Sequence, residues 1–192
     1  MQCLTLMVGL PGAGKSTLVR ELRERRPGVA VVSPDYIRLQ LFGVAFDYAV
    51  EDEVWSITRA LIQGHLNLRR SVILDATSLT PERRSRWIEL AKERGVPVGA
   101  VFINPPIETV FHQNQLREGD LVVPEDVIVN MSRILQAPTP EEGFHFIVEV
   151  RSVNEDVIEQ VVTCMDRAER ESLPRPVLVQ EQRRRAYGED TL

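Results

Sequence analysis

The chain has 192 residues, of which 43% are hydrophobic, and a formal net charge of −5. Its length suits one domain with a sizeable core, and no apolar stretch approaches the roughly 18 residues that span a membrane. The negative net charge does not favour a protein that binds long nucleic acid on a basic surface. The start of the chain lacks the pattern of a secretory signal, so we expect a cytoplasmic protein.

The first predicted element is a buried strand over residues 4–8, which leads directly into a phosphate-binding loop. Residues 9–16 read Gly-Leu-Pro-Gly-Ala-Gly-Lys-Ser and fit the P-loop pattern G-x-x-x-x-G-K-[ST]. Gly9, Gly12 and Gly14 permit positive φ and allow the backbone to come close to an anion. We therefore expect the loop to wrap its backbone N–H groups around the β-phosphate of a nucleotide.

The helix predicted over residues 16–26 completes this nucleotide site. Its N-terminal N–H groups and the positive end of its dipole favour a phosphate. Lys15 reaches the β- and γ-phosphates, and the Ser16 hydroxyl can bind Mg²⁺, so ATP and Mg²⁺ are the predicted cofactors. The predicted nucleotide-binding residues are Gly9, Gly12, Ala13, Gly14, Lys15, Ser16 and Thr17.

The second strand, predicted over residues 29–32, is followed by two charged side chains at the start of a helix. Ser33 is a suitable N-cap for a helix over 34–42. Asp35 and Arg38 are three positions apart and share one face of that helix. Ligands of an open parallel sheet bind beyond the carboxyl ends of its strands, so Asp35 is expected to face the same crevice as the P-loop. We predict that Asp35 accepts the proton of an attacking hydroxyl while Arg38 holds an anionic group of the acceptor; a helix-dipole Asp with a surface ion pair is the alternative.

A long helix predicted over residues 47–70 leads to a third strand over 71–75, which ends in Asp75. An apolar strand closed by a carboxylate resembles a Walker B strand, whose Asp can contact Mg²⁺ through water or orient a neighbouring Arg. Thr77 and Ser78 follow and can bind acceptor oxygens, although a turn or cap role fits them equally well.

A helix over residues 80–94 and a fourth strand over 98–103 lead to a polar segment, which we interpret as a lid over about 107–124. The first part of the lid, 107–117, has a helical pattern. Arg117 is predicted to stabilise the negative charge of a transferred phosphoryl group when the lid closes. The alternative is a solvated Arg that the dipole of the helix C-terminus favours.

The rest of the pattern completes one α/β domain. Strands that alternate with helices predict a doubly wound fold, and near-continuous apolar strands predict a parallel sheet buried on both faces. The remaining predicted elements are a helix over 124–136, a strand over 144–150 and a helix over 154–171.

Residues 1–171 are predicted to form the domain and 172–192 a C-terminal tail. Within the tail, 177–179 is either an edge strand or part of a poorly ordered terminus. Cys3 and Cys164 fit no metal or redox spacing, and both are expected to be buried thiols.

In this order, the motifs resemble the P-loop kinase domain of the polynucleotide 5′-kinases of phages and of bacterial RNA repair. The resemblance covers residues 2 to about 168. It is carried by residues 9–16, Ser33-x-Asp35-x-x-Arg38, Leu74-Asp75-Ala76-Thr77, Asn114-x-x-Arg117, Val123-Pro124 and Pro140-Glu141-Glu142-Gly143-Phe144. It implies a P-loop NTPase kinase fold, with a five-stranded parallel sheet flanked by helices and a helical lid.

The same resemblance implies a role for each site residue. Lys15 and Ser16 would bind the ATP phosphates and Mg²⁺, and Asp75 matches the strand-three Asp of the family. Asp35 would be the general base on a 5′-hydroxyl, and Arg38 would hold the neighbouring phosphate of the acceptor. The predicted catalytic residues are Lys15, Asp35, Arg38 and Arg117, the last as the lid arginine, and the predicted metal-binding residues are Ser16 and Asp75.

Two departures from the family pattern leave other activities open. Gln113 and Asn114 stand where the lid of the family often reads Arg-Asn, and no Asp-x-Asp-Gly-Thr phosphatase motif occurs, so a stand-alone kinase is expected. The predicted function is ATP-dependent phosphoryl transfer to a hydroxyl, foremost the 5′-hydroxyl of a nucleic acid end. One alternative is a small-molecule kinase, since zeta-toxin-like, antibiotic and metabolite kinases share the P-loop, the strand-two Asp and a lid Arg. The other is a nucleotide-dependent switch with slow hydrolysis. The loop near Ser152 and Val153 is a positional candidate for contact with the nucleotide base.

Overall fold

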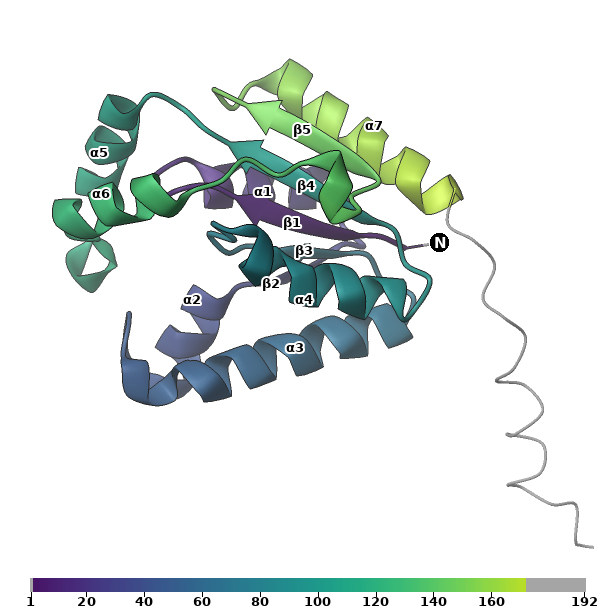
Figure 1. Cartoon of the computed structure of the whole chain (residues 1–192), viewed down its shortest axis with the longest axis horizontal. Coiled ribbons are helices and arrows are strands. Elements are labelled where there is room, and N and C mark those ends of the chain that lie inside the picture. The colour runs from purple at the N-terminus through teal and green to yellow at the C-terminus, as the bar shows by residue number, and fades with distance from the viewer. Residues whose placement is uncertain (1, 172–192) are drawn as a thin grey trace, which may run out of the picture.

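A single parallel sheet organises the molecule, which we describe over residues 2–171 of a computed structural model (Figure 1). All neighbouring strands pair in parallel, in the order β2-β3-β1-β4-β5. The predicted five-stranded parallel sheet is therefore confirmed. The strands are β1 (Leu4–Val8), β2 (Ala30–Val32), β3 (Val72–Leu74), β4 (Val98–Ile103) and β5 (Phe146–Val150).

Helices follow the strands as the alternating pattern predicts. They are α1 (Lys15–Arg25), α2 (Pro34–Ile37), α3 (Glu51–Asn67), α4 (Pro81–Lys92), α5 (Ile107–Gln115), α6 (Glu125–Ile134) and α7 (Glu155–Glu171). Most of their ends lie within two or three residues of the predicted ones, which is the usual uncertainty of helix boundaries.

Two predicted helices were too long or too regular. The helix predicted over 34–42 becomes a π-helical turn from Arg38 to Phe42, and the helix predicted over 47–70 begins with a separate 3₁₀ turn at Tyr48–Val50. The π-helical turn begins at Arg38, whose ion pair with Glu51 reaches across to α3. This tertiary contact is absent from the local sequence pattern. The N-cap of the 3₁₀ turn is Asp47, whose side chain accepts a hydrogen bond from the Ala49 N–H.

Each face of the sheet packs against its own pair of helices. Side chains of a strand alternate between faces, so Cys3 and Met7 contribute to one core cluster while Leu4 and Leu6 contribute to the other. The first cluster also contains side chains of α1 and α7, and the second contains side chains of α3 and α4. Burial of both faces explains why the strands read as near-continuous apolar runs.

Helices α5 and α6 lie together at one end of the molecule, beyond the carboxyl end of β4 (Figure 1). This end also carries the P-loop and the start of α2, so it is the edge where a parallel sheet binds its ligands. Between residues 2 and 171, no helix is long and apolar enough to cross a membrane.

Two smaller predictions concern the cysteines and the tail. Cys3 is fully buried, as expected. Cys164 is only partly buried, because it lies beside the row of buried α7 side chains and not within it. The predicted tail, 172–192, and its possible strand at 177–179 lie outside the described residues.

Candidate active site

The P-loop is packed tightly against the elements around it. A Cβ at Gly9 would lie 2.4 Å from the carbonyl oxygen of Ile103, and one at Gly12 would lie 2.6 Å from that of Val110. Both glycines also have positive φ. In addition, the Gly9 N–H donates to the Thr77 carbonyl at 3.0 Å, which ties the loop to the segment after β3. The phosphate-binding backbone is thus held by β4, α5 and the β3–α4 loop.

Lys15 is buried under this loop. Its Nζ donates to the carbonyl oxygen of Leu10 at 2.7 Å. Burial lowers the pKa of Lys15 from its ordinary value to about 8, against the opposing effect of the Asp75 and Asp35 carboxylates, while Arg117 lowers it further. The carboxylates of Asp35 and Asp75 and the guanidinium of Arg117, each predicted for the site from a different segment, thus all influence Lys15 electrostatically.

Ser16 and Asp75 form the pair of oxygen ligands predicted for a metal. The Ser16 hydroxyl donates to Oδ2 of Asp75 at 2.9 Å. Burial raises the pKa of Asp75, and the nearby Lys15 opposes that rise. A hydroxyl and a carboxylate beside a phosphate-binding loop fit Mg²⁺, which binds proteins through one or two oxygen ligands and takes the rest from phosphates and water.

Asp35 and Arg38 form the predicted pair, with Arg38 far more buried than the sequence suggests. Arg38 Nη1 donates to Oδ1 of Asp35 at 2.6 Å, which confirms that the two share a helix face. The Arg38 side chain is only 7% exposed, whereas that of Asp35 is 71% exposed. The carboxylate of Asp35 is thus open to an incoming group, while the buried guanidinium of Arg38 donates to it.

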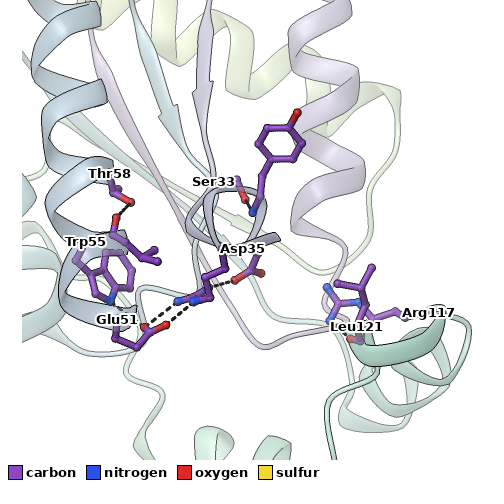
Figure 2. A network of polar contacts seen from close by, with 10 residues as sticks. Ser33, Asp35, Glu51, Trp55, Thr58, Arg117 and Leu121 are labelled. Carbon is purple, nitrogen blue, oxygen red and sulfur yellow. Dashed lines mark hydrogen bonds and ion pairs between the residues drawn. The ribbon is translucent and has the colours of Figure 1, made fainter. Parts of the chain in front are cut away.

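Glu51 is a site residue that the sequence analysis missed. Its carboxylate accepts from Arg38 Nη2 at 2.9 Å and also from Arg38 Nε. The Trp55 indole N–H donates to the same carboxylate at 3.2 Å, and the Arg38 guanidinium, the largest cause, lowers the pKa of Glu51. Figure 2 draws this network, with Glu51 and Trp55 on α3 and Asp35 at the start of α2. Since Arg38 and Glu51 are 13 positions apart, no helical spacing links them, and Glu51 reads as an ordinary acid of a first helical turn.

Arg117 lies in the segment predicted to be a lid, and in the view of Figure 2 it is on the opposite side of Asp35 from Glu51. Its Nη1 donates to the carbonyl oxygen of Leu121 at 2.9 Å. The lid loop is closed by buried Asn114, whose Nδ2 donates to the Val123 carbonyl at 2.7 Å and whose Oδ1 accepts from the Val123 N–H at 3.0 Å. Asn114 was part of the family pattern, but its role in shaping the loop could not be read from spacing.

A cleft of about 570 Å³ runs from the P-loop to the lid. It is lined by residues 12–17 together with Gln113 and Arg117 of the lid and Ser152 and Val153 after β5. Ser152 and Val153, the positional candidates for contact with the nucleotide base, thus line the same cleft as the P-loop, and their contact with a base stays a prediction. Ser78 differs, because it is buried in a left-handed turn, where a role in the turn fits better than contact with an acceptor.

Comparison with known proteins supports the family and the fold. A family model described as an AAA domain matches residues 4–138. The bifunctional polynucleotide phosphatase/kinase of Schizosaccharomyces pombe is 28% identical over 152 residues, which are 78% of this chain and 33% of that protein. The chain thus spans about a third of the length of this curated relative.

Two solved structures share the fold across nearly their whole length. Kti12 of Chaetomium thermophilum, in complex with ADP-AlF3, has a TM-score of 0.69 and 18% identity, covering 86% of this chain and 98% of its own. A sugar kinase from Janibacter has a TM-score of 0.62 and 19% identity, covering 91% of this chain and 100% of its own. At such low identity these two structures support the fold and no particular substrate.

Proposed function

This chain belongs to the AAA domain family, and from that premise and its site we propose that it transfers the γ-phosphoryl group of ATP to the 5′-hydroxyl of a nucleic acid end. Kinase-type phosphoryl transfer is supported by the P-loop, by the fold and by the relatives. One observation carries the proposal. It is the exposed carboxylate of Asp35, held by buried Arg38 and interacting electrostatically with Lys15 beside the P-loop.

In the proposed mechanism, each side chain acts on one part of the reaction. Lys15 and the P-loop N–H groups bind the β- and γ-phosphates. Mg²⁺, when bound at Ser16 and Asp75, would supply positive charge that offsets the negative charge of the phosphates. Asp35 orients the acceptor hydroxyl and takes its proton, and Arg117 stabilises the charge on the transferred group.

The first test follows label from γ-labelled ATP to 5′-hydroxyl oligonucleotides, run as both DNA and RNA. Wild-type protein should label the oligonucleotide, and Asp35→Ala should lower the rate at least about a hundredfold, because the hydroxyl loses its general base. The affinity for ATP should be unchanged. Asp52→Ala, an exposed acid of the first turn of α3, is the matched control and should transfer normally. Normal turnover by Asp35→Ala would show that Asp35 is not the base.

A small-molecule kinase is the second candidate. Two observations favour it: Gln113 lines the cleft where the related lids often carry a cation, and the net charge is −5. A negatively charged surface attracts a long polyanion less than it does a short or neutral acceptor. The same labelling assay with sugars and other small alcohols separates the two candidates. ATP binding with no labelled product from any acceptor would instead favour the nucleotide-dependent switch.

The pKa of Lys15 predicts how ATP affinity depends on pH. With a pKa of about 8 in the free protein, Lys15 is charged at pH 7 and largely neutral at pH 9. Bound phosphates favour the charged form, so ATP binding should weaken about tenfold between these pH values. Isothermal titration with ATP and Mg²⁺ measures the effect. Lys15→Met, which binds more weakly, should show no such fall, and a flat wild-type profile would contradict the lowered pKa.

A further inference from the structure

Exposed apolar side chains gather beside Asp35. Of the large apolar side chains that are exposed between residues 2 and 171, most lie on two segments, residues 36–48 and the lid loop 116–122. Within the first segment Phe46 is 57% exposed and Tyr48 is 86% exposed. Large aromatic groups exposed next to a ligand site are typical of a binding surface rather than of ordinary protein surface.

The backbone holds Phe46 and Tyr48 as a pair. Asp47, between them, has extended φ and ψ of −155° and 125°, so the two flanking side chains leave the chain on the same side. Their ring centroids are 4.8 Å apart with an interplanar angle of 82°, in an edge-to-face arrangement. The Asp47 side chain accepts from the Ala49 N–H at 2.9 Å, which fixes this turn. The pair is therefore a defined surface.

The aromatic pair is connected to the proposed base through Arg38. The Cζ of Arg38 lies 5.8 Å from the centroid of the Phe46 ring, and Nη1 of the same guanidinium donates to Asp35. One side chain thus separates the Phe46 ring from the Asp35 carboxylate. A nucleotide has its 5′-hydroxyl and its base on the same ribose, so a terminal nucleotide with its hydroxyl at Asp35 can extend its base toward this pair.

The ion pairs of Arg38 give a reason why the acceptor would need such a surface. Three nitrogens of its guanidinium donate to the carboxylates of Asp35 and Glu51, which leaves it poorly placed to supply ionic affinity. Stacking of bases on aromatic side chains provides affinity without charge and tolerates any base, because every base has a π-face.

We propose that Phe46 and Tyr48 form a stacking platform for the terminal base of the acceptor, and that this platform selects acceptors with a planar heteroaromatic ring at the phosphorylated end. The proposal rests on the proposed function, since it assigns the part of the acceptor next to the reacting hydroxyl. Phe46 and Tyr48 are specificity residues in this view, and they take no part in the chemical step.

The test compares two 5′-hydroxyl oligonucleotides that differ only in the presence or absence of the terminal base. Wild-type protein should have a KM at least about fivefold lower for the acceptor that carries the base. Tyr48→Ala should remove this preference by raising that KM, with kcat on the abasic acceptor unchanged, and Tyr48→Phe should retain it. Leu68→Ala, at an exposed apolar residue just beyond the other end of α3, is the matched control and should behave as wild type.

The outcomes separate this proposal from the proposed function. Equal KM values for the two acceptors in wild-type protein would overturn the platform and leave 5′-phosphorylation in place. If neither acceptor is phosphorylated, the proposed function fails, and equilibrium quenching of a terminal 2-aminopurine decides about the platform. Quenching that is lost in Tyr48→Ala supports it, and absence of quenching in wild-type protein overturns it. If the protein is a dimer, and Tyr48→Ala converts it to a monomer without changing either KM value, then Phe46 and Tyr48 serve self-association. That result would also overturn the proposal.

Discussion

Arg117→Ala is expected to reduce the rate of phosphoryl transfer about a thousandfold or more, with little change in ATP affinity. An arginine of this kind acts on charge that develops only in the transition state, so its loss lowers kcat rather than binding. The side chain already lines the cleft, and it interacts electrostatically with Lys15 and Asp75. Its contact with the Leu121 carbonyl involves Nη1, so other guanidinium nitrogens remain available for phosphate oxygens. Single-turnover kinetics at saturating ATP measures the loss.

A neighbouring arginine provides the control for this prediction. Arg133 is an exposed residue of α6 whose Nη1 donates to the Asn130 side chain at 3.3 Å. Arg133→Ala removes the same charge from the adjoining helix α6 and should change the rate less than about threefold, because an exposed charge is screened. A thousandfold loss in both variants would indicate that general electrostatics, and not a contact of Arg117, stabilises the reaction.

Glu142→Ala is expected to lower the free energy of unfolding by about 3–5 kcal/mol, because it leaves a buried arginine without its partner. The Arg84 side chain is fully buried, and its Nε and Nη2 each donate to the Glu142 carboxylate at 2.7 Å. Its Nη1 donates to the carbonyl oxygens of Ser78 and Gln136, so one guanidinium joins the β3–α4 loop, α4 and the segment after α6. Denaturant unfolding measures the change as a shift of the midpoint.

Glu141 is the matched control, since it is an exposed glutamate of the same turn. Glu141→Ala should change the stability by no more than about 0.5 kcal/mol, as surface substitutions usually do. The double variant Arg84→Met with Glu142→Ala should be less destabilised than the two single losses added together, because it removes the charge that would be buried alone. Equal midpoints for Glu142→Ala and Glu141→Ala would show that the ion pair does not hold this part of the fold.

Local patterns were enough to predict the elements that place the nucleotide. The P-loop, its flanking strand and helix, and the carboxylate at the end of β3 are each encoded in a short stretch of sequence. The five parallel strands follow from apolar runs that alternate with helical periods. The spacing of Asp35 and Arg38 correctly predicts their contact, because the geometry of one helical turn is sufficient for it.

Contacts between distant segments could not be predicted in the same way. The pairing of Arg38 with Glu51 depends on how the π-helical turn meets α3, and the pairing of Arg84 with Glu142 spans 58 positions. The role predicted for Arg38, binding a phosphate of the acceptor, remains a prediction. It would require the guanidinium to exchange one of its carboxylate partners for that phosphate.

The double hydrogen bond between Asn114 and Val123 has a consequence for how Arg117 responds to a ligand. These residues are nine positions apart, and their two bonds close the intervening segment into a ring. The conformational entropy of bringing the ends of that segment together is lost when the protein folds, not when the nucleotide binds. Gly12 of the P-loop has no side chain, and this leaves room for Val110 and Asn114, so the start of the ring packs directly against the P-loop. When a phosphate binds to the P-loop, the backbone that carries Arg117 is therefore already ordered. The remaining entropic cost is that of fixing the rotamer of the Arg117 side chain.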